Sequence, residues 1–466
     1  MRWWLASCLV LGMGCSSSGD LLNCDDEGNC ETGEQLVQYQ ARGVGINQIA
    51  LYQSVKVPFV ENGAEVSSGV PVVAGKEAMM RIYLSRVSGF SSREITGRLT
   101  VDFGADAPMI YETTMMVDTG WSEGDLSSTM NFTIDAEFMT PSATFQIELL
   151  ETEVGFEGSE EASNALFPAE GSASLRAEST GGSLKLYILP IAYNADGSGR
   201  TPNVDEPRIN KFISYTEALY PASTVDITVL PTKNWNQPVE AYGNGWGELL
   251  QEMYRERQRK SIPWDAYIYG LFVPDTSLAN YCSRGCILGL SALAQSPSDD
   301  WARISIGLGF PGDSSINTFL HEIGHAHGRA HAPCQTQDYD YNYPYSGGLI
   351  GSWGYNRNRD ILMPPSSYAD FMGYCDPSWI SDYTYGALFD RIQAVNGAAD
   401  MHWPEEIPRS WQTIFVNGDG TTTLGPVVEP GRVPVGQGRV VRLLDIRGDV
   451  VDEVQGHFAP YDHLPG

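Results

Sequence analysis

Four of the seven histidines of the chain lie in one short segment, residues 321–331, together with a glutamate. Apolar residues recur at helical spacing before and within this segment, which predicts a helix with one buried face. His321 and His325 would stand one turn apart on the same side, so both imidazoles can reach one metal ion. Glu322 lies beside the first histidine, where it can take a proton from a metal-bound water without coordinating the metal itself.

Gly328 is expected to end this helix, because glycine readily adopts the left-handed conformation that turns the chain back. His331 can then return as a third ligand. Three protein ligands leave a fourth position open to water, which is the arrangement of a catalytic zinc. The competing interpretation is a purely structural role for these histidines. Such a role would not require a glutamate at position 322. His327 points away from the ligand side and is interpreted as a surface or packing histidine.

The segment fits the pattern HExxHxxGxxH and resembles the zinc site of the metzincin metalloproteases. In that clan a methionine-containing turn lies beneath the metal, and Met372 is the natural counterpart here, with Met363 as the competing candidate. The resemblance implies that the hydroxyl of Tyr374 can reach the zinc or the oxyanion formed during hydrolysis; a packed tyrosine is the alternative. The resemblance covers roughly residues 183–396, and it is closest to the pappalysin-like branch, with the StcE-like bacterial proteases as another candidate.

Residues 183–400 alternate between strand and helix patterns, which indicates a mostly parallel sheet covered by helices. Strands are expected at 184–191, 225–230, 266–273 and 302–308, and helices at 204–219, 247–259 and 379–392. This order is similar to the amino-terminal half of a metzincin domain, in which a lower edge strand binds the substrate. The run 289–293 is the candidate for that edge strand.

Residues 36–182 show short alternating runs separated by glycine, proline and polar clusters, which predict an antiparallel β-sandwich. Strands are expected at 70–73, 78–84, 98–103, 109–117, 130–134 and 144–151. No cluster of titratable groups suggests chemistry there, so we interpret this part as a spacer or a substrate-docking module. Strand patterns return at residues 401–466. The predicted fold is therefore multidomain, with an α/β metzincin-like catalytic domain between an amino-terminal β-sandwich and a small carboxy-terminal β-domain.

The first residues combine one arginine, a brief apolar run and small residues around Cys15, as a secretory leader does. The apolar run is too short to span a bilayer. The segment resembles a bacterial lipoprotein signal, which implies a signal peptide over residues 1–14, a lipid on Cys15 and a flexible tether over residues 15–35. The expected location is the bacterial outer membrane or cell surface, with plain secretion as the alternative.

The chain carries 29 basic and 58 acidic residues, which gives a formal charge of −29. This charge argues against nucleic acid or an anionic membrane surface as a partner, so contact with a membrane is expected only through a lipid anchor. Most of the acidity is interpreted as a solubilising exterior. Weak Ca²⁺ sites in loops such as residues 194–199 are a further possibility.

Six of the eight cysteines follow the leader and Cys15, and an oxidising compartment would let them pair. The sequence alone does not fix the connectivity. The simplest pairing joins neighbours along the chain: Cys24 with Cys30, Cys282 with Cys286, and Cys334 with Cys375.

Together these features predict a zinc endopeptidase that cleaves extracellular proteins or glycoproteins, with one Zn²⁺ ion and Glu322 as the general base. A non-enzymatic surface lipoprotein, serving as an adhesin or scaffold with a vestigial zinc domain, is the alternative from another class. A protease restricted to glycoprotein substrates is a narrower enzymatic alternative.

Overall fold

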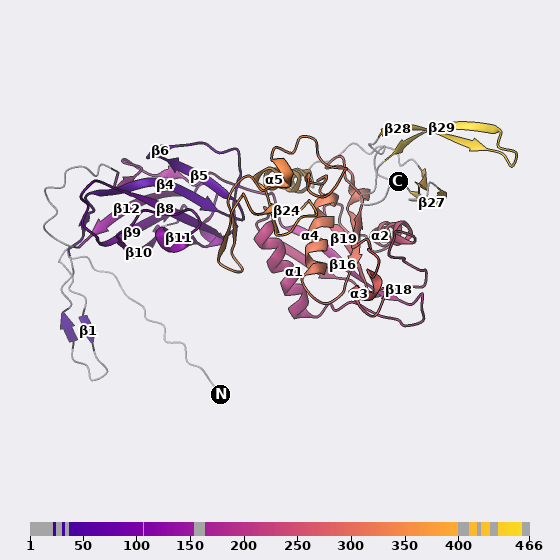
Figure 1. Ribbon diagram of the computed structural model, residues 1–466, viewed down its shortest axis with the longest axis horizontal. Coiled ribbons are helices and arrows are strands. Elements are labelled where there is room, and N and C mark those ends of the chain that lie inside the picture. Colours follow the sequence, from indigo (N-terminus) through magenta and orange to yellow (C-terminus); the bar gives the residue numbers. More distant parts are fainter. Residues whose placement is uncertain are drawn as a thin grey trace.

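The computed structural model describes residues 22–24, 30–32, 37–105, 107–152, 164–398, 410–416, 421–428 and 437–458. The signal peptide, Cys15 and most of the expected tether lie outside these residues. For Cys24 and Cys30 only the backbone is described, in the paired strands β1 (Leu22–Cys24) and β2 (Cys30–Thr32). A β-rich amino-terminal half lies beside an α/β half (Figure 1). Among the described residues, no helix is long and apolar enough to cross a membrane.

Two antiparallel sheets form the amino-terminal half. The first has the order β11-β8-β4-β5-β6, with bounds Met130–Ile134, Ala78–Arg86, Val44–Tyr52, Lys56–Glu61 and Ala64–Glu65. The second has the order β10-β9-β12-β13, with bounds Met109–Val117, Arg93–Asp102, Thr144–Glu151 and Leu166–Phe167, and the short strands β3 (Tyr39–Gln40) and β14 (Ala173–Ser174) also pair with β12. In β9 every second residue is buried, and inward-facing residues of both sheets share one core.

Strand β4 was not expected from the sequence, because it is buried on both faces and therefore lacks an alternating pattern. Its inner face contributes Ile49 and Leu51 to the core between the two sheets. Its outer face contributes Ala50 and Tyr52 to a smaller cluster that includes residues from the other half of the molecule. Two further short strands, β7 (Val72–Val73) and β15 (Ala177–Glu178), pair in parallel.

The α/β half is built on a six-stranded sheet with the order β17-β16-β19-β21-β20, and β18 also pairs with β16. Its strands are β16 (Leu184–Tyr193), β17 (Val225–Val229), β18 (Lys233–Trp235), β19 (Tyr267–Phe272), β20 (Gly289–Ser291) and β21 (Ile304–Leu308). All neighbours are parallel except β20, which pairs antiparallel with β21 at the edge of the sheet. The predicted edge strand is therefore confirmed over a shorter range, and its binding of substrate stays a prediction.

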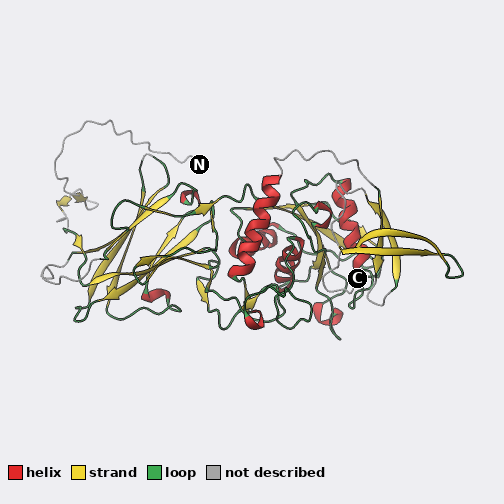
Figure 2. Ribbon diagram, turned by 90° about the horizontal axis from the view of Figure 1, so that it is seen from above, coloured by secondary structure: helices red, strands yellow, loops and turns green. Residues whose placement is uncertain are grey.

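Helices cover both faces of this sheet, and they gather in the middle of the molecule (Figure 2). Residues of α1 (Glu206–Leu219), α4 (Ser314–Ala326) and α5 (Asp382–Ala398) share one core with one face of the sheet, whereas α2 (Trp246–Arg259) packs on the opposite face. The short helix α3 (Leu278–Tyr281) precedes the edge strand. Helix α5 begins at Asp382 and not at residue 379, because the Ser381 hydroxyl accepts a hydrogen bond from the Thr384 N–H and caps it.

The two halves are joined by a loop of the α/β half that carries β22 (Gly354–Asn356) and β23 (Ile361–Met363). Gly354 forms an antiparallel bridge with Val55, just beyond β4. Further along the chain, the indole N–H of Trp379 donates to the carbonyl oxygen of Ser54 at 2.8 Å. The amino-terminal sheet thus bonds directly to two segments that follow the third histidine of the motif.

Lys76 is buried where the two halves meet. Its ammonium group donates to the carbonyl oxygens of Glu217 and Tyr220, at the carboxy-terminal end of α1. Burial lowers the pKa of Lys76 from 10.5 to about 7, because the charged form loses its hydration. The protonated form therefore costs free energy of desolvation in the folded chain, although both hydrogen bonds remain, and the neutral amine relieves that cost.

The free energy of unfolding is expected to rise with pH between about pH 7 and about pH 10, because the unfolded chain keeps Lys76 protonated there while the folded chain does not. Well below pH 7 Lys76 is protonated in both states, so it does not change how the free energy of unfolding depends on pH. Urea unfolding of the wild type and of Lys76→Met checks this. The difference in stability between them should change in favour of the wild type by about 1–3 kcal/mol from about pH 7.5 to about pH 9.5. A difference that does not depend on pH would contradict the assignment.

The carboxy-terminal residues form two hairpins, β26 (Trp411–Val416) with β27 (Thr422–Val428), and β28 (Gln437–Leu444) with β29 (Val450–Phe458). The sequence predicts a small β-domain here. Within the part of the chain that the structure describes, these strands remain separate pairs, and none of their residues belongs to a buried core cluster. Residues 417–420 have the sequence Asn-Gly-Asp-Gly, which predicts a turn, and they lie outside the described residues.

Candidate metal site

Helix α4 carries the first two histidines of the motif. Its apolar face, including Ile316, Phe319 and Ile323, packs into the core against the sheet, so the helix is fixed along its length. His321 and His325 then lie one turn apart on another side, and their Nε2 atoms are 3.0 Å apart. Both side chains are buried.

The chain turns back immediately after α4. Gly328 has a φ of +84°, and a Cβ atom there would lie 2.4 Å from the carbonyl oxygen of Ala294, so a larger residue would be both strained and obstructed. The turn brings His331 to the first two histidines. The ligand atoms of these three histidines lie within 4.8 Å of one another, so they could hold one metal ion.

The second nitrogen of each imidazole faces a backbone carbonyl. Nδ1 lies 2.8 Å from the oxygen of Phe371 in His321, 2.5 Å from that of Arg329 in His325, and 3.1 Å from that of Asp338 in His331. A carbonyl can only accept, so Nδ1 carries a proton in each ring and Nε2 is the nitrogen left to bind a metal. Three imidazoles whose Nε2 atoms converge are a donor set that suits zinc.

His327 does not join this group. Its ring stacks on Tyr267 with centroids 4.1 Å apart, and its Nδ1 lies 2.7 Å from the carbonyl oxygen of Ile323. Complete burial lowers the pKa of His327 to about 3, because the charged form would lose its hydration. The packing interpretation of this histidine is confirmed.

Met372 lies directly against the ligand helix. A Cβ atom on Gly324 of α4 would be 2.4 Å from its sulfur, so the missing side chain lets the turn approach the helix closely. Met363, the competing candidate, lies in β23. The main chain of the turn continues the contact, because the N–H of Ala332 donates to the carbonyl oxygen of Met372 at 3.0 Å. The turn thus supports α4 and the segment that follows His331.

Asp370 organises this turn and was not identified from the sequence. Its carboxylate is fully buried, and it accepts hydrogen bonds from the N–H groups of Met372 at 2.8 Å and Ser381 at 2.9 Å. Burial raises the pKa of Asp370, although these bonds act in the opposite direction. By holding the turn, Asp370 also places the carbonyl of Phe371 that orients His321. A sequence with 58 acidic residues gives no local signal for this one.

Tyr374 extends from the same turn to the Nε2 atom of His331. Its hydroxyl donates to Nε2 of His331 at 2.6 Å, and Tyr374 is 40% exposed whereas His331 is buried. The N–H of Tyr374 donates to the carbonyl oxygen of Cys334 at 3.0 Å. Cys334 and Cys375 form a disulfide with Cα atoms 5.8 Å apart, which ties the turn to the segment after the third histidine.

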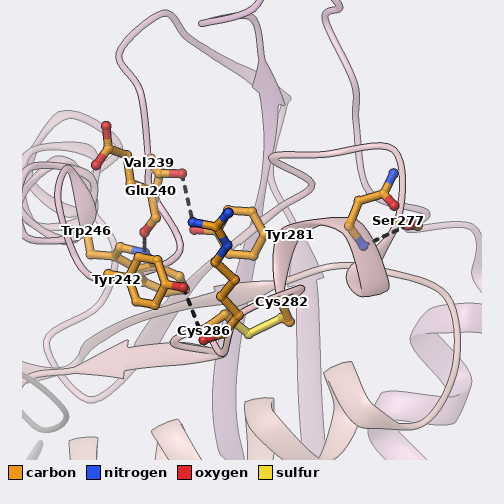
Figure 3. The surroundings of a disulfide bond; sticks show 10 residues. Val239, Glu240, Tyr242, Trp246, Ser277, Tyr281, Cys282 and Cys286 are labelled. Atoms are coloured by element: carbon orange, nitrogen blue, oxygen red, sulfur yellow. Dashed lines mark hydrogen bonds between the residues drawn. A yellow bond between two sulfur atoms is a disulfide. The ribbon is translucent and has the colours of Figure 1, made fainter.

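A second disulfide joins Cys282 to Cys286, just ahead of the edge strand (Figure 3). Hydrogen bonds hold this small loop against residues 239–246. The hydroxyl of Tyr242 donates to the carbonyl oxygen of Arg284, and that of Tyr281 donates to the carbonyl oxygen of Val239, both at 3.1 Å. The disulfide and these hydrogen bonds hold in place the segment of the chain that leads into β20.

The structure also describes Glu322 and the loop of residues 194–199, for which the sequence predicts a general base and a weak Ca²⁺ site. Glu322 is only 1% exposed, and its side chain lies against the edge strand. In the loop of residues 194–199, the carboxylate of Asp196 accepts a hydrogen bond from the Ser198 hydroxyl at 2.6 Å and pairs with Arg200. Calcium binding there stays a prediction.

Comparison with known proteins finds a similarity in the same region. Residues 303–377 match the family model described as Peptidase M66. No curated protein matches the chain. The matched residues run from β21 through α4 and all three histidines to the turn that carries Met372, Tyr374 and Cys375. The family match and the three converging histidines together support a zinc metallopeptidase in this part of the chain.

Proposed function

We propose that the protein is a zinc endopeptidase that hydrolyses peptide bonds of extracellular proteins. The observation that supports this best is the group of three buried histidines whose Nδ1 atoms face backbone carbonyls and whose Nε2 atoms converge. A zinc ion bound to His321, His325 and His331 would polarise a substrate carbonyl and lower the pKa of a water molecule toward neutrality. The match to a peptidase family over the same residues agrees with this chemistry.

Glu322 is the proposed general base. It follows His321 directly and is buried. The dielectric constant is lower in a protein interior than in water, so a charge on this carboxylate would interact more strongly with its neighbours. In the proposed reaction it takes the proton of the attacking water and later passes it to the leaving amine. Glu322 adjoins His321 in the chain but does not belong to the group of three histidines whose ligand atoms converge, and this supports the role of a base.

Tyr374 is the proposed donor to the oxyanion. Its hydroxyl lies 2.6 Å from Nε2 of His331, and that bond needs the lone pair of the nitrogen. A metal ion on that nitrogen would free the hydroxyl for another partner. A phenol aimed at a developing negative charge stabilises the transition state more than the ground state.

Export to the cell surface is part of the proposal. The leader-like first residues, the expected lipid on Cys15 and the acidic composition favour it. The disulfides Cys282–Cys286 and Cys334–Cys375 also fit an oxidising compartment outside the cytosol.

Chelation tests the proposed activity. Incubation with a zinc chelator should abolish cleavage of an unstructured protein such as casein, and added zinc should restore it, because the three histidines supply the binding site for the ion. His331→Ala is the matched control, since it should give protein that zinc does not reactivate. Cleavage that persists after zinc has been removed, as measured by metal analysis, would refute the proposal.

A further inference from the structure

The face of the sheet beneath the carboxy-terminal half of α4 is built from very small residues. Gly289 pairs with Gly307, and Ser291 pairs with Ser305, across the antiparallel strands β20 and β21. Neighbouring positions of these strands carry large apolar residues that pack toward α2. The Ser305 hydroxyl donates to the carbonyl oxygen of Glu322 at 3.2 Å and bonds the Ser291 hydroxyl at 2.9 Å. The small residues therefore lie against the helix that carries the first two histidines.

The side chain of Glu322 occupies the space that a side chain at position 289 would need. A Cβ atom on Gly289 would lie 2.4 Å from Oε1, 2.6 Å from Cγ and 2.7 Å from Cδ of Glu322. The conflict involves the stem of the glutamate as well as its end, so a small rotation of the carboxylate does not remove it. Glu322 is 1% exposed, so close-packed neighbours limit how far its side chain can shift.

Backbone freedom is not the reason for a glycine at position 289. Neither Gly289 nor Gly307 has a positive φ, so other residues could adopt this backbone. Gly307, the partner in register, makes room in the same way, because a Cβ atom there would lie 1.9 Å from the hydroxyl oxygen of Tyr269. What both positions require is the absence of a side chain.

We propose that Gly289 is a positioning residue that acts through Glu322. Its missing side chain leaves the room in which the glutamate lies between α4 and the edge strand. The inference rests on the proposed function, because the position of Glu322 matters for catalysis only if Glu322 is the base. It adds the edge strand to the parts of the protein that determine where the base lies.

The first test measures thermal stability in zinc-free protein and so needs no activity. Gly289→Ala should lower the Tm by about 3–8 °C in the wild-type background, because the added methyl overpacks against Glu322. In a Glu322→Ala background all three conflicting atoms are gone, so the same substitution should lower the Tm by less than about 1 °C. Equal shifts in the two backgrounds would overturn the proposal.

Gly270→Ala is the matched control. Gly270 lies in β19 of the same sheet but faces α2, where a Cβ atom would meet the sulfur of Met253 at 2.6 Å. Its effect on the Tm should be the same whether residue 322 is Glu or Ala. The control thus separates a specific conflict with Glu322 from a general weakness of the sheet.

The second test measures catalysis with zinc bound. Gly289→Ala should lower kcat by about 10²-fold or more while zinc binding is unchanged, and it should cause no further loss when Glu322 is already alanine. Full activity of Gly289→Ala would overturn the positioning role even if the Tm values are coupled. If the wild type cleaves no protein, the proposed function fails, and the Tm measurements alone then decide whether Gly289 makes room for Glu322.

Discussion

Glu322→Ala is expected to lower kcat by about 10²–10⁴-fold while about one zinc ion per chain remains bound. The loss follows from removing the only group proposed to take the proton of the attacking water. Zinc should stay, because the converging ligand atoms belong to His321, His325 and His331. Zinc content by metal analysis and turnover of a fluorogenic peptide check both parts of the prediction.

Glu206→Ala controls for the loss of a negative charge on a helix of the same half. Glu206 is exposed at the start of α1, so its removal should leave both turnover and zinc content unchanged. Loss of zinc from Glu322→Ala would make the glutamate a determinant of the metal site and not the base. Turnover retained at the wild-type rate would also exclude it as the base.

Tyr374→Phe is expected to lower kcat by about 100-fold or more, with little change in KM or Tm. The substitution keeps the ring and removes only the hydroxyl that lies 2.6 Å from Nε2 of His331. Phenylalanine keeps the ring contacts with His321 and His331, so stability should hold. Steady-state kinetics and a thermal melt measure the two effects separately.

Tyr341→Phe is the matched control, because Tyr341 belongs to the tyrosine-rich loop after the third histidine and is 81% exposed. It should behave as the wild type. A Tyr374→Phe variant with full turnover, or one that fails through a lower Tm, would leave Tyr374 as a packing residue.

The convergence of the three histidines could be predicted from the sequence because the information is local. His321 and His325 need only helical spacing to lie on one side, and Gly328 needs only its own backbone freedom to turn the chain toward His331. The groups that orient these rings could not be predicted in this way. The carbonyl of Phe371 reaches His321 from far along the chain, and a main-chain carbonyl carries no residue type that a sequence pattern could reveal.

The same limit applies to Gly289 and Asp370. Each acts through a contact between segments that only the fold brings together, with Glu322 for the glycine and with Ser381 for the aspartate. At the level of the fold, the alternation of strands and helices sufficed to predict a mostly parallel sheet. Strand β4 was missed because both of its faces are buried, which removes the period of two that marks a half-exposed strand.

The bonds between the amino-terminal sheet and the α/β half bear on how the molecule can move. Val55 pairs with Gly354, the indole of Trp379 bonds Ser54, and Lys76 bonds the end of α1. A hinge between the halves would have to break buried contacts of all three kinds at once, and a motion of that cost is rarely populated. Substrate should therefore enter and leave by local movement of loops over a rigid frame, and removing the amino-terminal half would loosen that frame instead of merely shortening a stalk.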